Sequence, residues 1–235
     1  MRLRNHNREN EKMKNVRSKR CVMVFAAFLL LLSVNLYAKE EGISEKQPKQ
    51  KPSKNQEFNQ VDVNDQLQKI IKGETEALKA NPKNATAYYN RGLAYHSLKQ
   101  YTRAIEDYTW AARLNPKDMR AYNNRGIVYG SQNQYAKSVE DFTRAIALDP
   151  DEPTLYRNRG AAYFNLQQYP KAILDYTKLM DLKPNHAAAY NNRGRCFLLI
   201  EKYRQACADA NKACDLGNCR LLDHLMESKK IDKCE

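Results

Sequence analysis

Several residue types on which catalysis and ligand binding depend are scarce in this chain of 235 residues. It has four histidines, and His6, His96, His186 and His224 are scattered, so the sequence predicts no metal site. It has eight glycines and no glycine-rich loop of the kind that holds phosphate groups. Aspartates recur at a fixed interval and do not converge as acid–base pairs do. We therefore expect no catalytic residue, no metal and no cofactor.

A strong excess of positive charge is missing from most of the chain. The formal net charge is +13, but eight of the forty lysines and arginines lie in the first twenty residues. The other 32 basic residues and 25 acidic residues are spread along the remaining chain. Such a balance favours solubility and is weak support for nucleic-acid binding. We therefore expect no nucleic-acid partner.

Long apolar runs are missing apart from residues 21–34, which have no charge and follow a basic stretch. At about 14 residues this run is shorter than the roughly 20 that span a bilayer as a helix. The layout is typical of a secretory signal. We predict a signal peptide over residues 1–38, cleaved after Ala38, and an exported protein, periplasmic or extracellular. The alternative is an uncleaved membrane anchor over residues 21–37, because Leu36 is larger than the residue preferred three positions before the cut.

The segment after this run has the composition of a tether. Residues 39–60 are rich in Lys, Glu, Gln and Ser and contain Pro48 and Pro52, so we predict a flexible linker. Helical periodicity begins at about residue 66, with apolar residues three, four and seven apart. We interpret residues 61–84 as a degenerate N-terminal half-repeat.

From residue 82 onward the chain repeats itself every 34 residues, which indicates a repeat architecture. The residues that keep the interval include five sets of identical residues. They are Pro82, Pro116, Pro150 and Pro184; Gly92, Gly126, Gly160 and Gly194; Asn90, Asn124, Asn158 and Asn192; Tyr101, Tyr135, Tyr169 and Tyr203; and Asp107, Asp141, Asp175 and Asp209.

The first unit has a pattern of aromatic and small residues that is specific to one repeat type. The pattern is Tyr88, Gly92, Tyr95, Ala104, Tyr108, Ala111 and Pro116. It resembles the tetratricopeptide-repeat family, and the resemblance covers most of the chain after the linker. This implies an all-α solenoid, in which antiparallel helix pairs stack into a right-handed superhelix with a concave groove. The units are 85–118, 119–152, 153–186 and 187–220, with a C-terminal capping helix in 221–235.

The recurring glycine needs a physical reason, because glycine in a helix costs about 1 kcal/mol relative to alanine. We expect a close approach of two helices, with Gly92 facing the small residue Ala104 and the rings of Tyr95 and Tyr108 filling the space alongside. The proline near the end of each unit disfavours helix at the residue before it. Each unit is thus predicted to be one antiparallel helix pair.

An arginine precedes each of these glycines, where the family usually has leucine, and an aspartate in the second helix returns with it. The pairs are Arg91 with Asp107, Arg125 with Asp141, Arg159 with Asp175, and Arg193 with Asp209. We interpret them as a structural ladder inside or between repeats rather than as a ligand site.

The family resemblance places partner-facing residues on the first helix of each pair. Mapped onto this chain they are Tyr89, Asn90, Leu93, Asn123, Asn124, Ile127, Arg157, Asn158, Phe164, Asn191, Asn192 and Arg195. The asparagines can hydrogen-bond the backbone of an extended peptide while its side chains vary. The alternative is that they hydrogen-bond only the next helix.

Five of the six cysteines lie between residues 196 and 234. In an oxidising compartment, disulfides that fix a small cap to the solenoid would stabilise it by about 2–4 kcal/mol each. We predict a buried free thiol at Cys196. We also predict at least one disulfide, with the pairing open, among Cys207, Cys214, Cys219 and Cys234. The alternative is that these cysteines are reduced and simply packed.

These features predict a non-enzymatic, exported scaffold or adaptor that binds a protein or peptide segment in its groove within an envelope assembly. One alternative is a structural component that uses its convex face or capped end. Another is a membrane-anchored repeat domain, which would contact the membrane only through its N-terminal segment. An enzyme would need a further domain or a thiol function at one of the C-terminal cysteines.

Overall fold

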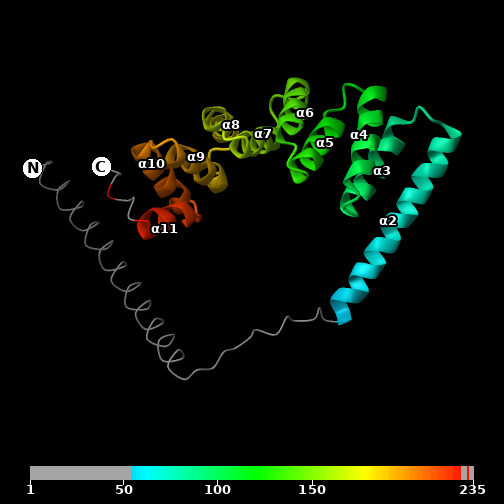
Figure 1. Cartoon of the computed structure of the whole chain (residues 1–235), viewed down its shortest axis with the longest axis horizontal. Coiled ribbons are helices and arrows are strands. Elements are labelled where there is room, and N and C mark those ends of the chain that lie inside the picture. The colour runs from blue at the N-terminus through cyan, green and yellow to red at the C-terminus, as the bar shows by residue number, and fades with distance from the viewer. Residues whose placement is uncertain (1–53, 229–231, 233–235) are drawn as a thin grey trace, which may run out of the picture. The chain divides into compact units, whose positions relative to one another are not determined.

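The structure is a computed structural model that describes residues 54–228 and Asp232. The predicted signal peptide at 1–38 and the predicted linker as far as residue 53 lie outside the described residues, as does Cys234. The described part of the chain contains ten α-helices and no strand (Figure 1). The helices are α2 (Lys54–Ala80), α3 (Ala85–Ser97), α4 (Tyr101–Leu114), α5 (Met119–Ser131), α6 (Tyr135–Leu148), α7 (Pro153–Asn165), α8 (Tyr169–Leu182), α9 (Ala187–Leu199), α10 (Tyr203–Asp215) and α11 (Arg220–Glu227).

The chain forms four helix pairs because the same start and stop signals return in each repeat. The first helix of each pair is capped by a side chain that accepts a hydrogen bond from a backbone N–H in the first turn. These caps are Asn84, Asp118, Glu152 and His186. The first helix ends where one residue takes a positive φ of 58–59°, which turns the chain back on itself. These residues are Lys99, Asn133, Gln167 and Glu201.

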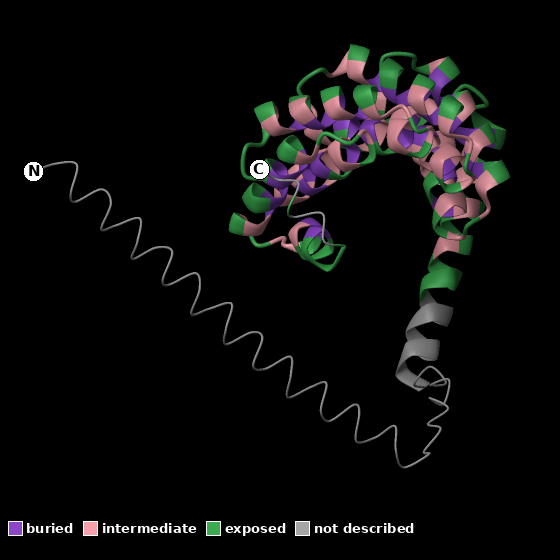
Figure 2. Ribbon diagram, turned by 60° about the vertical axis from the view of Figure 1, so that its left-hand side comes forward, coloured by how far each residue is buried: buried purple, intermediate pink, exposed green. Residues whose placement is uncertain are grey.

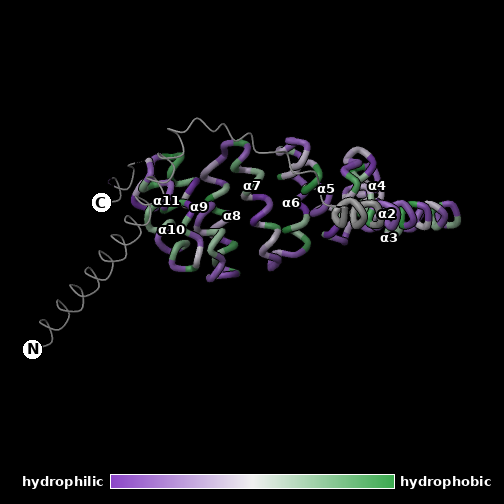
Figure 3. The backbone as a smooth tube through the Cα atoms, turned by 90° about the horizontal axis from the view of Figure 1, so that it is seen from below, coloured by the Kyte–Doolittle hydropathy of each residue, from purple (hydrophilic) through white to green (hydrophobic). Residues whose placement is uncertain are grey.

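The first helices lie on the inner side of the stack. Among the described helices α3 contacts α5 and α5 contacts α7, whereas no two second helices contact each other to the same extent. The pairs therefore follow an arc with the first helices on its concave side, and Figure 2 shows buried residues between the two layers. Figure 3 shows hydrophobic and hydrophilic residues alternating along the helices, as expected when one face of each helix is covered.

The repeated glycine does mark a close approach, but its neighbour differs from the one we expected. A Cβ atom built on Gly92 would lie 2.9 Å from the ring of Tyr108, which is 0% exposed, and Ala104 is not among its three nearest contacts. A Cβ atom built on Gly126 would likewise lie 2.9 Å from the ring of Phe142. In the first three repeats the glycine therefore makes room for a buried ring of the second helix. In the fourth repeat a Cβ on Gly194 would instead lie 3.3 Å from the backbone carbonyl of Ala206, the small residue at the position of Ala104.

The arginine–aspartate ladder is present in all four repeats, as predicted. Each arginine makes two hydrogen bonds to its aspartate, and each aspartate is buried. For Arg125 and Asp141 the two bonds measure 2.8 and 2.6 Å. The other pairs, Arg91 with Asp107, Arg159 with Asp175 and Arg193 with Asp209, have bonds of 2.7–2.9 Å. These hydrogen bonds raise the pKa of each arginine above its usual value.

The remaining guanidinium nitrogen links each repeat to the one before it. Nη1 of Arg125 donates to the hydroxyl of Thr109, which belongs to the second helix of the preceding pair, at 2.9 Å. The equivalent acceptors for the other arginines are Thr75, Thr143 and Thr177. The ladder is therefore continuous from α2 to α10.

Helix α2 packs on α3 as the second helix of an incomplete pair. It begins at Lys54 rather than at residue 61, so the predicted linker is helical over its last residues. No proline or glycine follows Pro52 in that stretch, and its Lys, Gln and Glu residues favour helix. No helix within residues 54–228 is both long enough and apolar enough to cross a membrane.

Helix α11 covers the open end of the fourth repeat. Its Leu221 and Leu225 are buried against Cys207 and Ala210 of α10. At the position of Ala210 the earlier repeats have the large rings of Tyr108, Phe142 and Tyr176. Leu221 takes that space and lies against Gly194. The cap therefore replaces a missing core side chain.

Candidate binding groove

The candidate site is the inner surface of α3, α5, α7 and α9, which we call the groove. Eleven of the twelve predicted groove residues are exposed or half-buried there. Asn191 is the exception, because it is 6% exposed and its amide donates to Asn218 at 3.0 Å. Glu74 of α2 likewise accepts from Asn90 at 2.9 Å. The amides of Asn124 and Asn158 also bond adjacent first helices, so hydrogen bonding to a neighbouring segment, the alternative interpretation, occurs at all four positions.

A chain of side-chain hydrogen bonds joins the groove across the first three repeats. The amide of Asn158 donates to Asn123 at 3.3 Å, Asn123 donates to Asn124 at 3.2 Å, and Asn124 donates to the hydroxyl of Tyr89 at 2.9 Å. Each amide has two N–H groups and an acceptor oxygen, so these bonds leave capacity for a ligand. The groove thus presents oriented amides to whatever lies in it.

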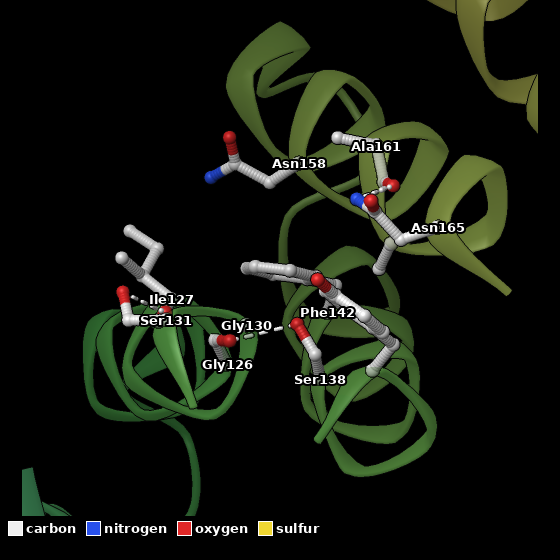
Figure 4. Close-up of a pocket in the computed structure, with 11 residues that line it drawn as sticks. Gly126, Ile127, Gly130, Ser131, Ser138, Phe142, Asn158, Ala161 and Asn165 are labelled. Carbon is white, nitrogen blue, oxygen red and sulfur yellow. Dashed lines mark hydrogen bonds between the residues drawn. The ribbon is translucent and has the colours of Figure 1, made fainter. Parts of the chain in front are cut away.

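A cavity of about 330 Å³, which we call the central cavity, opens in the groove between α5 and α7. Its floor is α6, and Figure 4 shows Ile127 and Ser131 on one side, Asn158 and Asn165 on the other, and the ring of Phe142 between them. The full lining is Gly126, Ile127, Gly130, Ser131, Tyr135, Ser138, Phe142, Asn158, Ala161, Ala162 and Asn165. Two predicted groove residues, Ile127 and Asn158, are among them.

A second cavity of about 310 Å³, the C-terminal cavity, lies between α9 and α11. Its lining is Ala188, Asn191, Asn192, Arg195, Asn218, Arg220, Leu221 and His224. Within residues 54–228 neither Arg195 nor Arg220 forms an ion pair. The guanidinium of Arg195 lies 5.0 Å from the centre of the Phe164 ring. This arrangement of cations and amides suits an anionic group.

Several residues that line the cavities were not predicted from the sequence. In the central cavity they include Gly130, Ser131, Ala161 and Asn165. Gly130 could have been found by comparing the repeats, because the other three have a large side chain at its position. Comparison of the repeats gives no such signal for the C-terminal cavity, because half of its lining residues follow α9, the first helix of the fourth repeat.

The structure also places the C-terminal cysteines. Cys214 and Cys219 form a disulfide between the end of α10 and the start of α11, and Cys207 is disulfide-bonded too. Cys196 is a free thiol and fully buried, and burial raises its pKa to about 12. At neutral pH this thiol is protonated and therefore a poor nucleophile.

Comparison with known proteins supports the repeat assignment directly. Residues 85–118 and 120–152 match one model of the tetratricopeptide repeat, and residues 153–186 match a second model of the same repeat. No curated protein matches the chain significantly.

Solved structures of the same fold are numerous. The crystal structure of MamA has 24% identity and a TM-score of 0.61, over 69% of this chain and 89% of that one. A MamA structure from Desulfovibrio magneticus RS-1 has 21% identity and a TM-score of 0.61, over 64% and 85%. YrrB, described as a TPR protein with an unusual peptide-binding site, has 22% identity and a TM-score of 0.64, over 72% and 88%. Residues 85–186 of this chain are therefore three tetratricopeptide repeats, and its described helices form a tetratricopeptide-repeat solenoid.

Proposed function

We propose that this protein is a non-enzymatic, exported scaffold or adaptor that holds an extended segment of another protein in its groove. Tetratricopeptide repeats generally mediate protein–protein interaction through such concave surfaces. YrrB, a solenoid of the same fold, has a peptide-binding site. The ligand is a segment of polypeptide whose backbone meets the groove amides and which carries an acidic group at the C-terminal cavity.

One observation carries this proposal: both cavities open on the first-helix face and are lined by residues that the family resemblance assigns to the partner. The central cavity includes Ile127 and Asn158, and the C-terminal cavity includes Asn191, Asn192 and Arg195. From the central cavity the hydrogen-bonded row of asparagines runs through the second repeat to Tyr89 of the first. A surface with apolar hollows, oriented amides and unpaired cations matches an extended peptide better than a flat protein face.

Replacing three groove side chains together is expected to weaken peptide binding by about tenfold or more, because each removes a hydrogen bond worth about 0.5–1.5 kcal/mol. The variant combines Asn124→Ala, Arg157→Ala and Asn158→Ala. The probes are linear peptides selected from a random phage-displayed library on the unmodified protein. Their affinities for both proteins are then measured by fluorescence anisotropy.

The matched control removes three exposed polar side chains from the second helices instead: Arg144→Ala, Lys178→Ala and Asn211→Ala. This variant is expected to bind the peptides as the unmodified protein does. If the control loses affinity and the groove variant keeps it, the partner lies on the second-helix face, and the structural alternative replaces the groove proposal.

Export is the second part of the proposal, and it is supported by the apolar run at residues 21–34 and by the disulfide-bonded cysteines. The protein recovered from cells is expected to begin at Lys39. Retention of residues 1–38 in the membrane fraction would instead favour the anchored alternative.

A further inference from the structure

One position in the first helix sets the central cavity apart from the rest of the groove. Counted by the 34-residue interval, it is filled by His96 in the first repeat, Gly130 in the second, Phe164 in the third and Leu198 in the fourth. Gly130 alone has no side chain. The second repeat therefore lacks a group that each of the other repeats places there.

In two of those repeats the side chain packs on the tyrosine that begins the second helix. His96 lies 6.1 Å from Tyr101 between ring centres, and Phe164 lies 5.6 Å from Tyr169 edge to face. The equivalent tyrosine in the second repeat is Tyr135, which lines the central cavity. The cavity is thus an unfilled side-chain position of the repeat.

A second small residue widens the same opening from the other side. Ala161 of α7 stands where the other repeats have Leu93, Ile127 and Arg195. Between the third and fourth repeats, Arg195 reaches over the ring of Phe164 at 5.0 Å. At the equivalent positions between the second and third repeats, Gly130 stands in place of the phenylalanine and Ala161 in place of the arginine.

The lining of the central cavity is uncharged, and its polar groups already have partners within the chain. Ile127, Phe142, Ala161 and Ala162 supply apolar surface. The polar side chains donate as follows: Ser131 to the carbonyl of Ile127, Tyr135 to Asn133, Ser138 to the carbonyl of Gly126, Asn158 to Asn123, and Asn165 to the carbonyl of Ala161. An apolar occupant gains free energy from burial against this surface, whereas a charged occupant would meet no opposite charge in the lining.

We propose that the central cavity receives one bulky apolar side chain, of the leucine or phenylalanine class, from the extended segment bound in the groove. The occupant supplies the packing against Tyr135 that His96 and Phe164 supply against the equivalent tyrosines of their own repeats. This inference rests on the proposed function and adds to it the chemistry of the residue that anchors the ligand. Asn158 and Asn165 at the rim meet the ligand backbone on either side of that residue.

Closing the cavity from within tests the proposal without disturbing the fold. Gly130→Leu places in the second repeat the residue that the fourth repeat has at Leu198. A Cβ on Gly130 meets only the hydroxyl oxygen of Ser138, at an ordinary 3.5 Å, so the helix accepts it. The matched control is Gly73→Leu, because Gly73 also lies in a helix and has open space around it.

The probes are again the phage-selected linear peptides. Those that bind the unmodified protein are expected to share a leucine, isoleucine, methionine or phenylalanine at one fixed position. Gly130→Leu is expected to weaken them by about 10- to 100-fold, since burial of one such side chain is worth roughly 1.5–3 kcal/mol. Gly73→Leu is expected to leave their affinity unchanged. Circular dichroism establishes that both variants are folded.

A double-mutant cycle assigns the loss to the cavity. Changing the shared apolar residue of the peptide to alanine is expected to weaken binding to the unmodified protein by a similar factor, and to have little further effect on Gly130→Leu. If Gly130→Leu binds the peptides as tightly as the unmodified protein while the triple groove variant does not, the anchor inference is wrong and the groove proposal stands. If the groove variant also binds fully, both are wrong.

Discussion

Asp141→Ala is expected to destabilise the solenoid by about 3–5 kcal/mol, because it leaves a buried arginine without its carboxylate. Arg125 is 16% exposed and Asp141 is 7% exposed at the side chain, so water cannot replace the two lost hydrogen bonds. The measurement is the urea midpoint of the circular dichroism signal, compared with that of the unmodified protein.

The control removes the whole ion pair instead of half of it. A variant with Arg125→Leu and Asp141→Leu carries the apolar residue that the repeat family usually has before the glycine. It is expected to be far less destabilised than Asp141→Ala, since no buried charge is left unpaired. If the single and double variants unfold at the same urea concentration, the loss comes from packing, and the ladder has no special electrostatic role.

The bond from Arg125 to Thr109 gives the same change a second consequence. In a solenoid each repeat is stabilised by its neighbours, so cooperative unfolding depends on the contacts between repeats. Loss of Asp141 frees the guanidinium that also bridges to the first repeat. We therefore expect the Asp141→Ala transition to broaden as well as shift, as the repeats on either side begin to unfold separately.

The parts of the structure that the sequence predicts are those that return at a fixed interval. The 34-residue period gave the helix pairs, and the joint return of arginine and aspartate gave the ladder. The threonine acceptors were missed although they keep the interval too, because a hydroxyl in a helix has many uses and suggests no single partner. The ring of Tyr108 was expected alongside Gly92, but not as its nearest neighbour, because sequence spacing does not show which of two facing residues comes nearer.

The central cavity could not be predicted in the same way, because it depends on what one repeat lacks. Comparison of the repeats shows that Gly130 lacks a side chain, but only the structure shows that it lines a cavity together with Tyr135 and Ala161. The predicted groove residues were mapped from the family resemblance, and all but Phe164 fall at three repeated positions. Such a mapping passes over a site made by a departure from the repeat. The C-terminal cavity depends on how α11 folds back on α9, which no repeat pattern describes.

Gly194→Ala is expected to destabilise the protein by about 2 kcal/mol, although alanine is the better helix former. The new Cβ would lie 2.5 Å from Leu221 of the cap, 3.0 Å from the Cβ of Asp209 and 3.3 Å from the carbonyl oxygen of Ala206. The last of these is backbone and cannot turn away, so α9 and α10 must separate or the cap must shift. The measurement is the shift of the urea midpoint.

Gly130→Ala is the matched control, because it makes the same change in a first helix where the Cβ has room. It is expected to raise stability by up to about 1 kcal/mol, the ordinary gain of alanine over glycine. The difference between the two variants measures the close approach of helices alone. If Leu221→Ala is added to Gly194→Ala, the combined loss is expected to be smaller than the sum of the single losses, since the shortest contact is then removed. If the two losses in stability add fully, α11 does not contact α9 at this glycine. Leu221 then covers the end of the solenoid without taking the place of the missing ring.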